Sequence, residues 1–188
     1  HPIPRRQRQM CIRDRVEAEA STYNSLKVAN EKATTQAGAY MGTYGLSSMA
    51  FALILTFFSS KRKVNRRWVH ALSLAIGAAG FFSMKFVTSP EMLHLSYACI
   101  GVAWGSILSM PYAMLSSSIK ASQMGLAMGI FNIFIVIPQI VAALGGITLT
   151  AETFLGEDLI HTMTLAGFSL LLASLFTLVI TERYAVSD

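Results

Sequence analysis

The side chains of this sequence that offer binding chemistry are two amides and two aromatic rings set in apolar stretches. Asn132 and Gln139 stand seven residues apart, which places them nearly eclipsed on one face of a helix. An unpaired amide in hydrocarbon is costly, so this face is expected to point into a helical bundle. Trp104 and Tyr112 precede the amides. Aromatic faces stack on the C–H faces of sugars and amides bind their hydroxyls, so the set suits a neutral sugar.

Small and hydroxylic residues recur every three or four positions beside the two rings, which predicts one helical face. They are Tyr97, Gly101, Gly105, Ser109 and Tyr112. Whether the amide face meets a sugar hydroxyl or another helix stays open at this point. The residues hypothesised to bind substrate are Trp104, Ser109, Tyr112, Asn132 and Gln139.

Glycine and proline positions bear on how the helices meet. Gly101 and Gly105 have the GxxxG spacing that lets two helix backbones approach closely, and so do Gly125 and Gly129. Helix packing is the role predicted for all four. Pro111 and Pro138 each remove a backbone hydrogen bond and are expected to kink their helices, and the freed carbonyls need partners in protein or in a water-filled cavity.

The apolar stretches of the chain hold no residues arranged for catalysis. They contain no Asp or Glu, no histidine pair at metal spacing, no nucleophile elbow and no phosphate-binding loop. We therefore expect no enzyme, no cofactor and no metal. His70, His94 and His161 lie near the ends of the stretches, where an interfacial side chain is the expected role. An anionic substrate would require a buried base, and Lys85 is peripheral.

Composition places these residues in a membrane. Hydrophobic residues make up 53% and charged residues 13%, whereas soluble domains carry about 25% charged residues. Five apolar stretches are each long enough to cross a bilayer. They are residues 39–59, 68–88, 93–114, 124–148 and 161–181. The predicted fold class is all-α, a polytopic membrane helical bundle.

Charge in the loops predicts the orientation. One loop carries five bases and no acid, namely Lys61, Arg62, Lys63, Arg66 and Arg67. The positive-inside rule puts this loop and the tail 182–188 in the cytoplasm, and residues 16–38 then form an outer loop. The net charge of +5 is thus a topology signal and does not indicate nucleic acid.

Residues 1–15 are not counted in the predicted fold. Residues 1–15 resemble a translated sequencing adapter more than protein, and a basic cytoplasmic arm is the alternative. Five spans with an outer N-terminus are unusual for transporters built from repeated halves. We therefore expect a fragment of a longer protein, whose missing N-terminal half is a partner of this one.

The run from Gly101 to Gln139 resembles the C-terminal half of the sucrose and maltose type sugar symporters of the major facilitator superfamily, the glycoside-pentoside-hexuronide-like type. The elements Ala103-Trp104, Met110-Pro111-Tyr112-Ala113, Phe131-Asn132 and Ile137-Pro138-Gln139 follow in the same order and nearly the same spacing. Thr22-Tyr23-Asn24, the basic loop and His70 resemble the family less clearly.

This resemblance implies twelve helices, of which about helices eight to twelve are present. It implies uptake of a disaccharide or glucoside coupled to a cation, H⁺ by the family pattern, through alternating access around a midplane site. The basic loop would be a degenerate copy of the family's cytoplasmic motif, here without its usual Asp and Gly. The family's proton-coupling carboxylates lie mainly in the half that precedes this one.

Two functions remain at this stage. The first is a sugar:cation symporter, placed by the resemblance in a bacterial inner (plasma) membrane and surrounded by lipid. The alternative is a non-transporting sensor or scaffold that kept the fold. It predicts binding without flux. The particular sugar, the coupling ion and the oligomeric state are not determined by the sequence.

Overall fold

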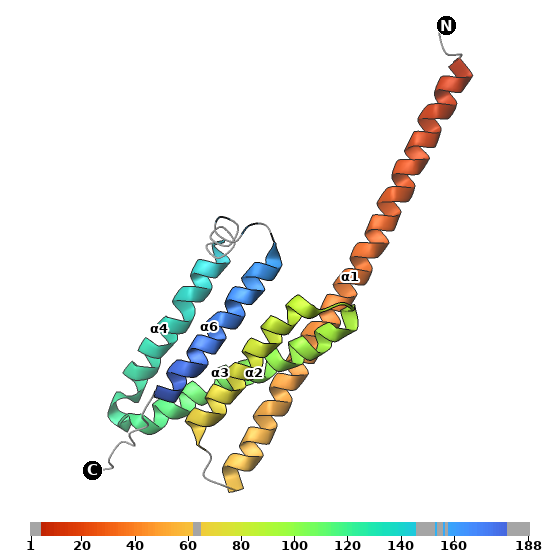
Figure 1. Ribbon diagram of the computed structural model, residues 1–188. Helices are drawn as coiled ribbons and strands as arrows, with labels where there is room; N and C mark the ends of the chain where they lie inside the picture. The colour runs from red at the N-terminus through yellow and green to blue at the C-terminus, as the bar shows by residue number, and fades with distance from the viewer. Residues whose placement is uncertain (1–4, 62–64, 146–152, 154–155, 157, 180–188) are drawn as a thin grey trace. The chain divides into compact units, whose positions relative to one another are not determined.

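The computed structural model describes residues 5–61, 65–145 and 158–179, together with Thr153 and Gly156. This part of the chain is helical and contains no strand (Figure 1). The long helices are α1 (Arg5–Lys61), α2 (Arg66–Ser83), α3 (Leu93–Ser118), α4 (Met124–Ala143) and α6 (Leu159–Val179). Short 3-10 turns connect them, namely η1 (Met84–Phe86), η2 (Pro90–Met92) and η3 (Ala121–Gln123). The all-α class is confirmed.

Within the described residues, five helical segments are long and apolar enough to cross a membrane, as the sequence predicted. They are Val16–Phe58, Arg66–Phe86, Pro90–Ser118, Ala121–Ala143 and Ile160–Val179. The first segment begins 23 residues before the predicted start at residue 39, and the bounds of the other four shift by a few residues. Helix α2 begins early because the Asn65 side chain accepts a hydrogen bond from the Trp68 N–H at 3.5 Å. Helix α4 ends early because Gly145 has a φ of 82°.

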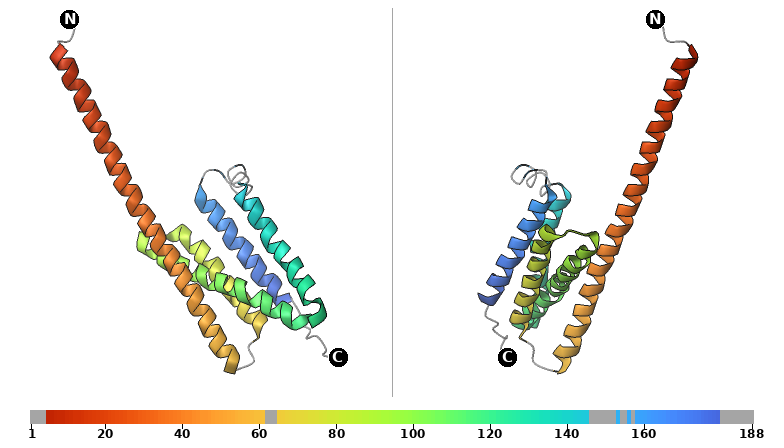
Figure 2. Two further views of the ribbon diagram at one scale, coloured as in Figure 1. Left: turned by 180° about the vertical axis from the view of Figure 1, so that it is seen from behind. Right: turned by 45° about the vertical axis from the view of Figure 1, so that its right-hand side comes forward.

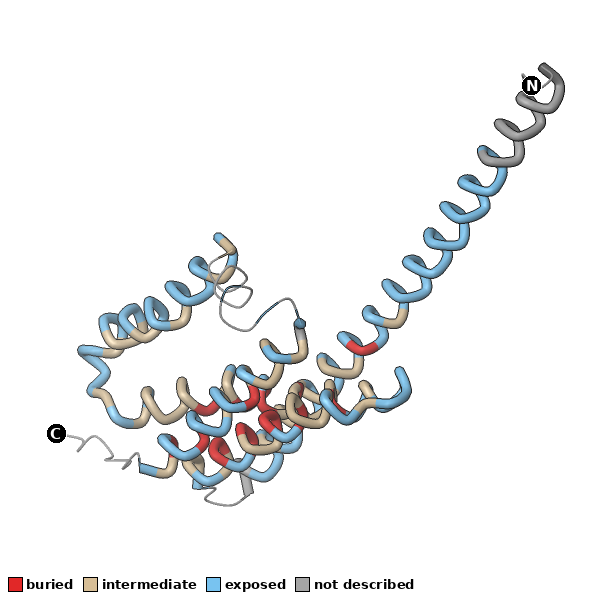
Figure 3. Tube along the Cα trace, turned by 45° about the horizontal axis from the view of Figure 1, so that its top comes forward, coloured by how far each residue is buried: buried red, intermediate tan, exposed pale blue. Residues whose placement is uncertain are grey.

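Residues 16–38, which the sequence predicted to form a loop, are part of helix α1. The first 22 of these residues contain neither Pro nor Gly and are rich in Ala, Glu and Lys, which favour helix. The chain divides into two compact units, His1–Met41 and Gly42–Asp188. In the first unit, the side chains described from Val16 onward are mostly exposed (Figure 3).

Helix α2 is central to the second unit and packs against both α3 and α6 (Figure 2). Glycine makes the approach possible. A Cβ on Gly80 would stand 2.8 Å from the Cβ of Cys99 on α3, and a Cβ on Gly167 of α6 would stand 2.9 Å from the Phe82 ring. Neither distance is sterically allowed. The buried residues of α2 and α3 gather where these helices meet (Figure 3).

Hydrogen bonds made by side chains join α2 to α3 from one end of the pair to the other. Arg66 Nη1 donates to the Ala113 carbonyl at 2.8 Å, near one end of the pair. His70 Nδ1 lies 2.8 Å from Ser106 Oγ, and Ser83 Oγ lies 2.7 Å from Ser96 Oγ near the other end. We call these three contacts the α2–α3 seam. Their order shows that the two helices run in opposite directions.

His70 corrects an expectation from the sequence. Its side chain is 7% exposed and lies inside the bundle, not at an interface. The register of α2 decides this, because His70 follows Arg66 by one turn and shares its α3-facing side. His94 and His161 are exposed, and His94 Nδ1 lies 2.7 Å from Thr43 Oγ1 on α1.

Helices α1 and α3 meet at the first GxxxG pair and run in the same direction. A Cβ on Gly101 would overlap the Tyr44 carbonyl and the Ser47 hydroxyl, and one on Gly105 would stand 2.9 Å from the Ser48 carbonyl. Gly101 and Gly105 thus lie at a close helix contact, in the role that the GxxxG spacing predicted.

A methyl group at Gly80 tests the closeness of α2 and α3. Gly80→Ala should lower the free energy of unfolding by about 1–3 kcal/mol, because its Cβ meets backbone and Cβ atoms that cannot move aside. Gly129→Ala is the matched control: no atom lies within 4 Å of its Cβ, so the change should be neutral or stabilise by up to about 1 kcal/mol. Thermal unfolding in detergent measures both. Equal midpoints for the two variants would contradict the contact.

A second substitution tests the α2–α3 seam. Ser106→Ala should destabilise the protein by about 1–3 kcal/mol, because it leaves His70 Nδ1 buried without a partner. Ser118→Ala should have little effect, since Ser118 is exposed and bonds the carbonyl of Met114 in its own helix. The same unfolding assay decides, and a Ser106→Ala midpoint equal to that of Ser118→Ala would rule out a stabilising bond.

Candidate substrate-binding face

A short hydrogen bond connects two of the predicted site residues across α3 and α4. The Tyr112 hydroxyl donates to Asn132 Oδ1 at 2.6 Å. The Tyr112 ring also meets the Phe131 ring edge to face, with centroids 4.9 Å apart. The Asn132 oxygen accepts this bond, and its NH₂ group remains as a donor. No group in the described part of the chain accepts from it.

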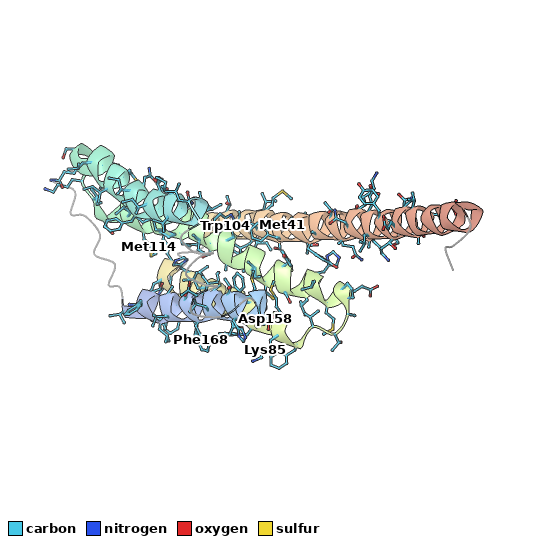
Figure 4. All side chains as sticks on the ribbon, turned by 90° about the horizontal axis from the view of Figure 1, so that it is seen from above. Met41, Lys85, Trp104, Met114, Asp158 and Phe168 are labelled. Atoms are coloured by element: carbon cyan, nitrogen blue, oxygen red, sulfur yellow. The ribbon has the colours of Figure 1, made fainter. Side chains whose placement is uncertain are left out.

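Trp104 lies on the same helix as Tyr112, two turns earlier, and is 39% exposed. In Figure 4 it is on the opposite side of α3 from Phe168 of α6. Its ring centroid is 6.3 Å from that of Tyr44 on α1, and the two planes are inclined by 43°. The Trp104 indole N–H finds no acceptor among the described residues.

Gln139 shares the Asn132 face of α4, as the seven-residue spacing predicts. Both amides are exposed, and Gln139 has no hydrogen-bond partner among the described residues. Gly125 and Gly129 lie on this side too, and a methyl group added to either would have no atom within 4 Å. The opposite side carries bulky apolar residues, all exposed: Leu126, Ile130, Phe134, Ile137 and Val141. Helix α4 thus has one small, polar side and one side suited to lipid.

Pro111 and Pro138 lie inside α3 and α4, as expected. Since proline has no N–H, the carbonyls of Ile107 and Phe134, four residues earlier, lack their usual helical donor. Two carbonyl oxygens are therefore left to accept hydrogen bonds at membrane depth, one on each of the two helices that carry the candidate site.

Two predicted features have a different role from the one expected. The Ser109 hydroxyl donates to the Gly105 carbonyl of its own helix at 2.7 Å, so its proton is already used. The small face that was predicted on α3 is largely the contact with α1, through Gly101 and Gly105. The sequence did not indicate that Tyr44 lies beside Trp104. No local pattern reveals this neighbour, because it depends on the contact between α1 and α3.

The basic loop divides between described and undescribed residues. Arg66 belongs to the α2–α3 seam and also reaches Ser117 Oγ at 3.1 Å. Arg67 is half-buried in the first turn of α2. The side chains of Lys61, Arg62 and Lys63 lie outside the described residues. Within the part of the chain that the structure describes, no three His, Cys, Asp or Glu side chains gather as metal ligands would.

Five apolar helices, a polar seam inside the bundle and a polar side on α4 define the class: an integral, polytopic α-helical membrane protein. The family model described as Major Facilitator Superfamily matches residues 20–143, and the chain belongs to that superfamily. It is therefore a membrane transporter of a family whose members are not enzymes. Among curated proteins nothing matches the chain, and the same is true among solved structures.

A double-mutant cycle tests the Tyr112–Asn132 bond. Tyr112→Phe and Asn132→Leu should each destabilise the protein, while the double variant should lose less than their sum. The difference, the coupling energy, should be about 0.5–1.5 kcal/mol, as for one hydrogen bond. Unfolding free energies of the four proteins give it. A coupling energy of zero would show that the two side chains do not interact.

Proposed function

We propose that this transporter carries a neutral sugar, a disaccharide or glucoside, and that the face formed by α1, α3 and α4 is part of its binding site. The proposal rests on a difference between two sets of polar side chains. Along the α2–α3 seam the polar side chains pair with one another, whereas Trp104, Asn132 and Gln139 retain donors that no described residue accepts. A sugar hydroxyl is a partner of the right kind for each of them.

The charge of the region supports a neutral substrate. Between Gly42 and Val179 the described acids are Glu91 and Asp158, and both lie outside the long helices. Arg66 and Arg67 are at the first turn of α2, and Lys85 is in η1. Lys120 precedes η3, and Arg66 bonds the carbonyl of Ala113, the residue after Tyr112. Among the described residues, no charged side chain bonds the side chains of Trp104, Tyr112 or Asn132. Binding here would depend on stacking and neutral hydrogen bonds.

Coupling to a cation, which we take to be H⁺, and alternating access rest on the resemblance to the sucrose and maltose type symporters. We further propose that the first turn of α2 and the last turns of α3 and α6 face the cytoplasm. Arg66 bonds the Ala113 carbonyl of α3, and Ser174 of α6 bonds the Ala71 carbonyl of α2 at 2.7 Å. The basic loop is at this end, in accord with the positive-inside rule.

Uptake measurements test the proposal. The complete gene that contains this sequence is expressed in a host without disaccharide transport. Radiolabelled sucrose or maltose should accumulate, and a protonophore should abolish the accumulation. Failure to accumulate any disaccharide or glucoside would overturn the proposed substrate class, and binding without flux would favour the sensor or scaffold.

Asn132→Leu in the same protein separates binding from stability. If Asn132 contacts the sugar, uptake should fall about two- to tenfold, as expected for one lost hydrogen bond of about 0.5–1.5 kcal/mol at about 1.4 kcal/mol per tenfold. The amount of protein in the membrane should stay normal. Loss of the protein from the membrane would instead show that Asn132 acts through its bond to Tyr112 and not through the sugar.

A further inference from the structure

We infer that Tyr44 of α1 is a further substrate-contact residue, which forms with Trp104 of α3 the aromatic part of the sugar site. The inference rests on the proposed function and adds a helix to it, since the residues named from the sequence all lie on α3 and α4. Three observations support it: the geometry of the two rings, the state of their polar atoms, and the way α1 and α3 meet.

The two rings form an open corner. Their centroids are 6.3 Å apart and their planes are inclined by 43°, between stacked and perpendicular. Rings that serve only to fill a core usually bury both faces. Here Trp104 is 39% exposed and Tyr44 is half-buried, so each ring keeps apolar surface for a further contact. A sugar ring, with C–H faces and hydroxyl edges, fits such a corner.

The polar atoms of both rings lack partners. Neither the Tyr44 hydroxyl nor the Trp104 indole N–H makes a hydrogen bond with any described residue. Tyrosine and tryptophan usually find such a partner when they are taken out of water. Tyr112 shows the other case, because its hydroxyl is used by Asn132. Tyr44 therefore offers what Tyr112 cannot: a free phenol that donates to, or accepts from, a sugar hydroxyl.

The backbone contact between α1 and α3 holds the corner in place. Gly101, three residues before Trp104, lies directly against the Tyr44 carbonyl. The side chains of Tyr44 and Trp104 therefore branch from their helices next to a close backbone contact. Trp104 and Tyr112 are eight residues apart, about 12 Å along the axis of α3. The aromatic corner and the Tyr112–Asn132 pair thus lie at two depths, and the first would stack on the sugar while the second hydrogen-bonds it.

The full gene product in a host without disaccharide transport tests the inference. Tyr44→Leu removes the ring and should raise the KM for the transported sugar at least tenfold, while Vmax and membrane abundance stay near wild type. Tyr44→Phe keeps the ring and removes the hydroxyl, so its KM should rise two- to fivefold. Phe57→Leu is the matched control, because Phe57 is an exposed aromatic residue of the same helix whose ring meets that of its neighbour Phe58, 5.9 Å away between centroids.

Each outcome decides something different. A wild-type protein that carries no sugar overturns the proposed function, and the inference with it. A wild-type protein that carries a sugar, with the KM of Tyr44→Leu equal to that of Phe57→Leu, overturns the inference alone. If Tyr44→Leu does not reach the membrane, Tyr44→Phe decides: a raised KM supports contact with the sugar, and an unchanged KM refutes it.

Discussion

The close approach of helix backbones at glycine is the constraint on which the rest of this bundle depends. Lipid offers no hydrophobic driving force between helices, so they associate through tight contact and through hydrogen bonds. Gly80 lets α2 approach α3, Gly167 lets α6 approach Phe82 of α2, and Gly101 lets α3 approach α1. Where backbones are this close, side chains as short as serine reach across. The α2–α3 seam follows from the glycines.

The polar groups of the bundle are of two kinds: those that bond one helix to another, and those left to bind something else. His70 and Ser106 are buried and paired, and they fix how α2 lies on α3. On the other side of α3 the amides of α4 and the rings of Trp104 and Tyr44 keep donors without described partners. In hydrocarbon such groups are costly unless they line a cavity or meet a ligand. A transporter needs groups of the second kind, because a substrate must be able to leave them.

For residues of α3 and α4, the structure can be compared with what the sequence predicted. The sequence pairs Tyr112 with Asn132 only by type, as two residues suited to a sugar, and the structure joins them by a 2.6 Å hydrogen bond. Ser109 changes from a candidate ligand to a residue bonded to its own helix. His70 changes from an interfacial side chain to a buried one. Each change depends on the neighbour that a residue meets in the fold. The hydropathy pattern of a single helix does not identify that neighbour.

By itself the sequence determined the solvent, the number of spans and the neutral character of the candidate site. Apolar runs of bilayer length and the lack of acids within them are local properties, readable without coordinates. It also placed Asn132 and Gln139 on one face, since helical periodicity is fixed. The helical state of residues 16–38 is likewise favoured by their local composition. The pairing of His70 with Ser106 and the corner of Tyr44 and Trp104 could not be read from the sequence. The two contacts join residues 36 and 60 positions apart, and only the tertiary structure brings such distant segments together.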